Sequence, residues 1–310
     1  MERTDRLVLI DGHAILHRAY HALPPLTTRS GELVNAVYGF ATMLFRILNE
    51  LQPKYLAVAF DTPKPNFRHM EYVGYQAQRP KTDSELSGQI EKVQELVATF
   101  DIPIFSVEGF EADDVIGTLA EQASQSKVDE VVIVTGDRDL MQLVRDEVKL
   151  YMPTRGLSEG QMVGRKEVQE KMGLPPEQIV DYKGLVGDQS DNYPGVSGIG
   201  PKTAVELLKK FGTLEEIYER LGEVGNKVTV RKLAEGVESA MLCKKLAIIV
   251  TNVPISLDLE KCLVQNYDKE KVIRFFKELG FRSLISRMTG EREKKGMRND
   301  KKIDTQQSLF

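Results

Sequence analysis

The chain has 310 residues, of which 41% are hydrophobic and 28% are charged, a composition typical of globular proteins that excludes wholesale disorder. No stretch approaches roughly eighteen consecutive apolar residues, and the charged N-terminal segment does not have the apolar length of a secretory signal. Cys243 and Cys262 are the only cysteines, too few for a disulfide framework or a CxxC metal site. We therefore expect a soluble cytoplasmic protein with room for two domains.

The net charge of −4 hides an asymmetry along the chain. Residues 1–191 contain 20 Lys and Arg against 30 Asp and Glu, whereas residues 192–288 contain 16 against 12 and residues 289–310 contain 6 against 4. A chain with one acidic and one basic half is able to bind a polyanion with the second while it concentrates carboxylates in the first. Multivalent cations bound to the carboxylates would allow the acidic half to lie close to the polyanion.

Short apolar runs alternate with helical periodicity in the first half, a pattern that indicates βαβ units around a parallel sheet. The expected strands are 7–10, 55–60, 102–107 and 131–135. The expected helices are 35–51, about 84–99, the segment around 115–120, and 140–144. Fold class is therefore α/β.

From about residue 175 the pattern indicates helices only. A glycine-rich segment at 195–200 precedes a strong helix at 203–211. Further helices are expected at about 213–221, 229–235, 237–248 and 268–279. The charged residues 289–305 are nearly devoid of apolar side chains and indicate a flexible tail. We therefore divide the chain into residues 1–175, 176–288 and 289–310.

Acidic residues follow the expected strands at equivalent positions. The carboxyl ends of parallel strands meet at one edge of a sheet, so these side chains should converge there. For the group that opens the helix after the third strand, capping of the helix dipole is the alternative explanation. The nine acids, in chain order, are Asp11, Asp61, Glu111, Asp113, Asp114, Asp137, Asp139, Asp188 and Asp191.

Nine gathered carboxylates require cations. Two like charges about 4 Å apart repel by roughly 1 kcal/mol in water and by about 4 kcal/mol at an effective dielectric constant near 20. Oxygen ligands suit Mg²⁺, or Mn²⁺ as a substitute, rather than zinc. The number of acids is sufficient for two ions roughly 3.5–4 Å apart, an arrangement that promotes phosphodiester hydrolysis.

A glycine-rich turn, GVSGIGPK, begins at Gly195 and ends at Lys202. Backbone amides in such a turn approach phosphates at a helix N-terminus, and Lys202 adds positive charge. A lone glycine-rich turn is weak evidence. Its position between an acidic pair and a basic helical region favours a phosphate-binding role.

Five motifs, in chain order, resemble the 5′-nuclease (flap endonuclease) family of 5′→3′ exonucleases, which includes the N-terminal domain of bacterial DNA polymerase I. They are LIDGHAILHRAYHAL, VAFDTPKPNFRHMEYVGY, EADD, VTGDRDLMQLV and LVGDQSDNYPGVSGIGPKTA. The resemblance covers residues 5 to about 288. It implies a PIN-like nuclease core in 1–175, a helix–three-turn–helix DNA-binding region in 176–288, and cleavage of flaps and nicked duplexes during replication and repair.

The resemblance also implies roles for the acids. Asp11, Asp61, Glu111 and Asp113 match the ligands of a first metal site. A second site is matched by Asp137, Asp139 and Asp188, with Asp113 between the two sites. Asp114 and Asp191 would be inner- or outer-shell residues.

Further positions match residues that contact DNA in the family. Arg18, Arg68 and Arg79 would handle phosphates near the site, and Tyr75 would stack on the terminal base. The glycine turn would also bind K⁺ through backbone carbonyls. The residues expected to hold the duplex are Gly195, Gly198, Gly200, Lys202, Thr203, Lys209, Lys210 and Lys232.

One departure from the family concerns Gln76, which stands where the family commonly has a lysine that stabilises charge on the scissile phosphate. Either the nearby Lys81 substitutes for the missing lysine, or the rate of DNA cleavage is reduced. Because every carboxylate is retained, we expect activity. Two rival hypotheses stay open: a catalytically weak DNA-structure or clamp-associated binding protein, and a PIN-like ribonuclease.

Two remaining motifs lie outside this scheme. His13, His17 and His21 share a helix face, but no acid completes an HExxH zinc motif, so solvent or phosphate contact is favoured over zinc. The last five residues, QQSLF, are similar to the bacterial sliding-clamp-binding peptide, with Gln306 as polar anchor and Leu309 and Phe310 as apolar anchors. A chance match in a frayed terminus is the alternative.

Overall fold

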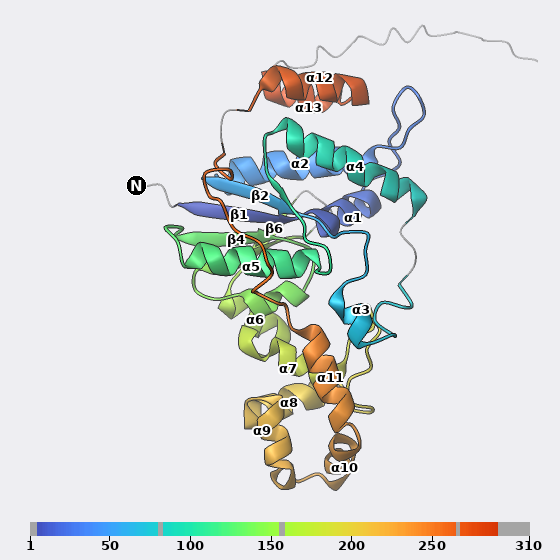
Figure 1. Cartoon of the computed structure of the whole chain (residues 1–310), viewed down its shortest axis with the longest axis vertical. Helices are drawn as coiled ribbons and strands as arrows, with labels where there is room; N and C mark the ends of the chain where they lie inside the picture. Colours follow the sequence, from blue (N-terminus) through green and yellow to red (C-terminus); the bar gives the residue numbers. More distant parts are fainter. Residues whose placement is uncertain (1–4, 80–82, 155–158, 265–266, 291–310) are drawn as a thin grey trace, which may run out of the picture.

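Six strands form one sheet in the part of the chain that the computed structural model describes, which is residues 5–79, 83–154, 159–264 and 267–290 (Figure 1). The order across the sheet is β3-β2-β1-β4-β5-β6, and all neighbours are parallel except β5 and β6. The strands are β1 (Arg6–Asp11), β2 (Tyr55–Ala59), β3 (Ile104–Phe105), β4 (Glu130–Val134), β5 (Val148–Pro153) and β6 (Gly160–Val163).

Helices cover both faces of the sheet, so its central strands are apolar on both sides. Val8 and Ile10 of β1 point into one helical layer, and Leu7 and Leu9 point into the other. The first layer consists of α1 (Gly12–Ala22), α2 (Asn35–Glu50), α4 (Ser84–Thr99), α12 (Lys269–Leu279) and α13 (Arg282–Thr289). The second contains α5 (Ala112–Ser124), the 3₁₀ turn η1 (Asp139–Leu143) and α6 (Arg165–Met172).

A helical lobe with its own apolar core extends from this sandwich (Figure 1). Its first and last long helices, α7 (Ile179–Val186) and α11 (Val237–Ala247), pack side by side and form the neck of the lobe. The remaining elements are α8 (Pro201–Phe211), α9 (Leu214–Glu219), α10 (Lys227–Glu235) and the 3₁₀ turns η2 (Pro176–Gln178) and η3 (Leu221–Glu223). A short helix, α3 (Phe67–Glu71), lies between β2 and α4 in the chain.

The α/β prediction is confirmed, and the structure refines its details. The strand expected at 102–107 has only two residues, and the helix expected at 140–144 is the 3₁₀ turn η1. Strands β5 and β6 and helices α3 and α6 were not predicted, whereas α7 and α13 lie in the region after residue 175 where helices were expected but were not given bounds. The sheet is therefore mostly parallel, with an antiparallel edge strand at β6.

After the neck, the chain returns to the sandwich. Ile249 and Val253 pack in the second layer, and α12 and α13 then pack on α2 and α4 in the first. Residues 268–288, which the sequence assigned to the DNA-binding region, therefore pack with the sheet-based part of the chain. The physical reason is their apolar stripe, which includes Val272, Phe276 and Leu284.

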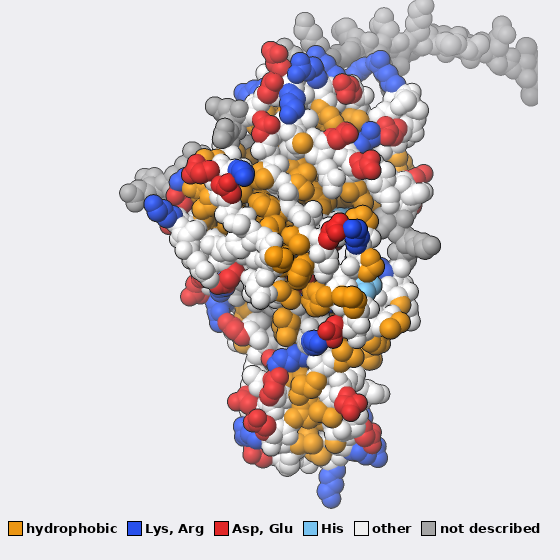
Figure 2. All heavy atoms as spheres, in the orientation of Figure 1, with side chains coloured by type: hydrophobic (Ala, Val, Ile, Leu, Met, Phe, Trp, Pro, Cys, Tyr) orange, Lys and Arg blue, Asp and Glu red, His pale blue; other side chains and the backbone are white. Residues whose placement is uncertain are grey.

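Among the described residues, none of the helices is long and apolar enough to cross a membrane. Figure 2 shows Lys and Arg side chains interspersed with Asp and Glu over the visible face, with a band of apolar side chains that continues from the sandwich into the lobe. Because neither sign of charge dominates this view, a binding surface has to be argued from individual residues.

Phe276 tests the docking of α12. Its ring is fully buried and lies 6.0 Å from the ring of Phe45 and 5.9 Å from that of Phe281, between ring centroids. We expect Phe276→Ala to lower the free energy of unfolding by about 3–5 kcal/mol, since it leaves a cavity between α12 and the first layer. Urea denaturation checks this. The half-buried neighbour Phe275 is the control, and an equal loss in Phe275→Ala would contradict this packing.

Candidate active site

Asp11 is the acid nearest the centre of the sheet. As the last residue of β1 it also caps α1, because its Oδ1 accepts a hydrogen bond from the Ala14 amide at 3.0 Å. Its Oδ2 accepts from the hydroxyl of Thr135, just past β4, at 2.7 Å. Burial raises the pKa of Asp11 to about 7 despite these donors. The carboxylate is thus held rigidly where β1 and β4 end.

Asp61 and Asp113 meet at the start of α5. The Asp61 Oδ1 accepts from the Ala112 amide at 2.8 Å, while the Asp61 amide donates to His13 Nδ1 at 3.0 Å. Asp113 accepts no hydrogen bond from any described residue. Burial, together with the charges of Asp137, Asp11, Glu111 and Asp61, raises the pKa of Asp113 well above its ordinary value. An acid without donors among other acids is a good fit for a cation.

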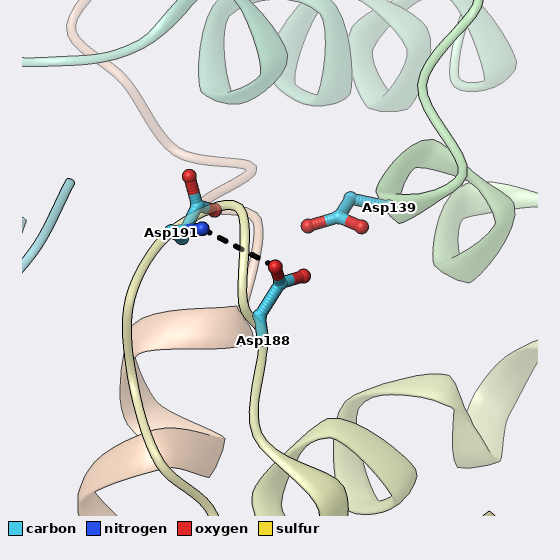
Figure 3. A group of neighbouring side chains, drawn as sticks. All are labelled: Asp139, Asp188 and Asp191. Carbon is cyan, nitrogen blue, oxygen red and sulfur yellow. Dashed lines mark hydrogen bonds between the residues drawn. The ribbon is translucent and has the colours of Figure 1, made fainter. Parts of the chain in front are cut away.

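Asp139, Asp188 and Asp191 form a second group, with one carboxylate oxygen of each within 4.8 Å of the others (Figure 3). Asp139 lies in η1 after β4, and the other two lie on the turn that follows α7. The Asp191 amide donates to the Asp188 Oδ1 at 3.2 Å, which fixes the turn. The group therefore joins the sandwich to the neck of the lobe.

Lys183 of α7 is a residue of the candidate site that the sequence analysis missed. Its buried ammonium contacts Asp139 and donates to the Asp188 Oδ2 at 2.6 Å. Burial opposes the charge of Lys183, but the two carboxylates outweigh it and raise the pKa of the lysine. The available signal is the apolar surroundings of Lys183 in the sequence, which favour a buried and hence paired lysine.

Burial and the charge of Lys183 together determine the direction in which the pKa values of the second group of acids are shifted. Burial raises the pKa of Asp139 to about 7 even though Lys183 opposes the shift. Burial likewise raises the pKa of Asp191. For Asp188, burial acts upward, but the charge and hydrogen bond of Lys183 outweigh it and lower the pKa. The three carboxylates thus share one internal cation.

The charge balance of the whole edge points to further cations. The nine predicted acids end or follow strands β1, β2 and β4, begin α5 or lie on the turn after α7, and we call this set the acidic edge. Within the described residues, only Arg68 and Lys183 form ion pairs with them as permanent cations. His13 is within 3.2 Å of Asp61, but burial lowers the pKa of this imidazole. Oxygen-only donors around an undercompensated charge suit hard divalent ions.

Arg68 does not have the geometry predicted for it. Its guanidinium is buried and pairs with both oxygens of Asp114, through Nη1 at 2.7 Å and Nη2 at 2.8 Å. It also donates to the carbonyls of Leu246 at 2.9 Å and Ile248 at 2.7 Å. With its donors used inside the protein, Arg68 is not available to a phosphate.

The contacts of Asp114 likewise contradict the metal-ligand role predicted for it. It is fully buried, and besides Arg68 it accepts from the amides of Glu111 at 3.1 Å and Val250 at 2.8 Å. These donors saturate its oxygens. Asp114 is therefore a structural partner of Arg68 rather than a metal ligand.

Tyr75 is likewise buried and cannot present its ring to a terminal base. Its hydroxyl donates to Glu111 at 3.1 Å and lies 3.4 Å from Asp191. Gln76 follows with a left-handed backbone, φ 52°, and its side-chain amide donates to Asp191 at 3.0 Å and Glu111 at 3.3 Å. Asn66, which the sequence analysis missed, also donates to Glu111, at 2.6 Å. Neutral donors thus connect the two acidic groups.

The other side chains predicted near the site, those of two arginines and two histidines, differ in exposure and in their partners. Arg79 is exposed, and its charge lowers the pKa values of His13 and His17 after the larger effect of burial. Arg18 donates to the carbonyl of Thr154. His17 and His21 lie 3.4 Å apart between Nε2 atoms. Lys81 and residues 306–310 lie outside the described residues.

The glycine turn is closely packed on α11 and α10. The amide of Gly195 donates to the Cys243 Sγ at 3.2 Å, and its carbonyl accepts from Ser239 at 2.6 Å. At Gly195 the φ of 66° and the close approach of the Gly187 backbone leave no room for a side chain. The ammonium of Lys232 donates to the Gly198 carbonyl at 2.9 Å.

The predicted duplex contacts on α8 differ in their exposure and in their hydrogen-bond partners. Lys202 and Lys209 are exposed, and Thr203 and Gly200 lie at the start of the helix. Lys210 instead donates to the carbonyl of Glu223 at 2.5 Å. Two of the predicted duplex contacts, Lys210 and Lys232, therefore have partners within the lobe.

Comparison with known proteins adds family matches over most of the chain. Residues 6–173 match the family described as "5'-3' exonuclease, N-terminal resolvase-like domain", and residues 174–270 match "5'-3' exonuclease, C-terminal SAM fold". The chain is 45% identical over 283 residues to DNA polymerase I of Bacillus caldotenax, an alignment covering 91% of this chain and 32% of that protein. DNA polymerase I of Bacillus subtilis (strain 168) is 42% identical over 288 residues, covering 93% and 33%. The chain spans about a third of the length of these relatives.

Solved structures share the fold. The T5 D15 flap endonuclease, in a pseudo-enzyme-product complex with DNA and metal ions, superposes with a TM-score of 0.67 at 20% identity, covering 89% of this chain and 99% of the other. The catalytic core of Rad2 in complex with DNA substrate gives a TM-score of 0.59 at 19% identity, covering 89% and 88%. The sandwich and the helical lobe therefore recur together in other proteins.

Arg68 provides a test of this geometry. Arg68→Met leaves the Asp114 carboxylate buried without its ion-pair partner, so we expect a loss of about 3–5 kcal/mol in the free energy of unfolding. The exposed arginine of the same segment is the control, and Arg79→Met should change stability by less than about 0.5 kcal/mol. Chemical denaturation measures both. Wild-type stability in Arg68→Met, with weaker DNA binding, would restore the phosphate role.

Proposed function

Because the chain belongs to the 5′-3′ exonuclease family, we propose that it is a structure-specific 5′ nuclease that hydrolyses DNA phosphodiesters at flaps and nicks. The observation that carries the proposal is the gathering of carboxylates that end or follow strands β1, β2 and β4, begin α5 and lie on the turn after α7, with too few cations to balance them. The T5 D15 and Rad2 structures, solved with DNA, support DNA as the substrate.

Two Mg²⁺ ions are the proposed cofactors, with Mn²⁺ as a substitute. The residues that would hold them are Asp11, Asp61, Glu111, Asp113, Asp137, Asp139, Asp188 and Asp191. Of these, Glu111 would have to exchange some of the hydrogen-bond donors that occupy both its oxygens. When bound, such ions supply the charge that activates water and stabilises phosphate oxygens. Zinc bound to T5 5′-exonuclease supports a divalent site in this fold.

Within this site, the chain's own residues have distinct tasks. Asp11 and Asp61 are held by backbone amides, so their oxygens are presented in fixed positions. Lys183 keeps Asp139 and Asp188 close despite their mutual repulsion. Gln76 and Tyr75 keep Glu111 and Asp191 within one hydrogen-bond network. Preorganisation of this kind reduces the cost of assembling the reactive geometry.

The helical lobe is proposed to hold the duplex, mostly without sequence readout. The glycine turn with Lys202, Thr203 and Lys209 would contact phosphates. A K⁺ ion at the turn would have to share the Gly198 carbonyl with Lys232 or displace that ammonium. The proposed division is a nuclease core in 1–175, on which residues 268–288 also pack, a DNA-binding region formed by the lobe helices α7 to α11 of the predicted segment 176–288, and a tail in 289–310.

The first test removes one acid and compares substrates. Asp137→Asn should lower Mg²⁺-dependent cleavage of a 5′-flap DNA by about 10²- to 10³-fold, because several kcal/mol of charge stabilisation are lost. DNA binding should be retained or tighter, since a charge facing phosphate is removed. Asp146→Asn, at an exposed acid outside the site, is the control. Wild-type rates in Asp137→Asn would remove Asp137 from the mechanism, and preferential cleavage of single-stranded RNA would favour a ribonuclease.

Gln76 favours one alternative function, a catalytically weak binding protein. Its neutral amide stands where the family commonly has a cation, between Glu111 and Asp191. We expect Gln76→Lys to raise the cleavage rate about tenfold, because charge-assisted hydrogen bonds are roughly twice as strong as neutral ones. Gln76→Met, which keeps the length and loses the donor, is the control. Equal rates for wild type and Gln76→Lys would mean that the amide suffices.

The tail is proposed to bind a bacterial sliding clamp through Gln306, Leu309 and Phe310. Leu309→Ala and Phe310→Ala should each weaken clamp binding by about 2 kcal/mol, or roughly 30-fold, since pocket-filling anchors carry most of an interface's energy. Titration against the clamp measures this, with Ser308→Ala as control. Deletion of 306–310 should leave the nuclease rate on a short flap unaltered. Equal clamp affinity of the full chain and the deletion would contradict the proposal.

A further inference from the structure

A groove open to solvent lies where the sandwich meets the helical lobe, with a volume of about 580 Å³. Four cationic side chains line it, Arg138, Lys171, Lys202 and Lys209, together with a single acid, Glu206. We call this feature the basic groove. Arg138 and Lys171 were not among the predicted DNA contacts.

The cations of the basic groove differ from neighbouring cations in that they have no ion-pair partners, although the acid Glu206 also lines the groove. Within the described part of the chain, none of the four forms an ion pair. On the same helix as Lys171, Arg165 pairs with Glu177 and Lys166 with Glu170 at 3.8 Å. Four exposed cations that face one space repel one another, so an anion in the groove would be stabilised.

The cations that line the basic groove belong to both the sandwich and the lobe. Arg138 stands between Asp137 and Asp139, in the loop where β4 runs into η1. Lys202 and Lys209 lie on α8, immediately after the glycine turn, and are two helical turns apart and therefore on one face. Lys171, at the end of α6, lines the same groove. The row of cations thus leads from the lobe to the acidic edge.

We propose that the basic groove binds the phosphodiester backbone of the DNA strand that passes from the helical lobe to the acidic edge, with Arg138 and Lys171 as additional phosphate contacts. The proposal rests on the proposed nuclease function. An open groove with cations spread along it suits a polyanion better than a single small anion, which would favour a closed pocket.

The test measures the salt dependence of binding for Lys171→Ala. A nicked duplex is titrated with the full chain, with Ca²⁺ in place of Mg²⁺, at salt concentrations from 50 to 200 mM. Loss of one phosphate contact should reduce the slope of log affinity against log salt by about 0.9, so the variant should lose about 3.5-fold less affinity over this range. Lys166→Ala, five residues earlier on α6 and paired with Glu170, should keep the wild-type slope.

A second measurement locates the contact. Replacing single phosphates by neutral methylphosphonates should weaken wild-type binding at a position where Lys171→Ala is insensitive. Wild-type cleavage of a 5′-flap DNA is measured in parallel. If the wild type cleaves while Lys171→Ala keeps the full slope and the full methylphosphonate sensitivity, the basic groove is not a DNA path and the nuclease function stands. If the wild type neither cleaves nor binds DNA, the proposed function fails, and this proposal fails with it.

Discussion

A single buried guanidinium joins three parts of the chain beside the acidic edge. Arg68 connects α3 to Asp114 at the start of α5 and to the carbonyls of Leu246 and Ile248 where α11 ends. Burying two charges is favourable only if their geometry and remaining hydrogen bonds are satisfied, as they are here. The pair therefore fixes the start of α5, and with it Asp113 and Glu111, relative to the neck of the lobe.

Lys183 has a comparable role at the other group of acids. It belongs to the neck helix α7, yet it balances Asp139 of the sandwich as well as Asp188. The candidate site is thus assembled at the junction of sandwich and lobe, and its acids are gathered at an electrostatic cost. Functional sites commonly keep such unfavourable arrangements of charge at a cost in stability, because the chemistry requires that geometry.

The sequence was sufficient to predict the central strands and the convergence of the acids, because apolar runs and the residues that end them follow the period of the sheet. It could not separate Asp114 from Asp113, since adjacent residues at a helix start point in different directions, one toward Arg68 and one toward the other acids. The motif positions of Arg68 and Tyr75 likewise gave no information on burial. Lys183 and the return of α12 to the first layer depend on long-range packing that no local pattern records.

The path of the chain through the neck has a mechanical consequence. The lobe is connected to the sandwich by two neighbouring segments, one entering α7 and one leaving α11, and both ends of the described chain belong to the sandwich. Two neighbouring connections oppose free swivelling of the lobe, which a single connection would allow. A torque that a bound molecule exerts on the lobe would consequently be transmitted to the carboxylates at the junction instead of being dissipated in a single flexible link.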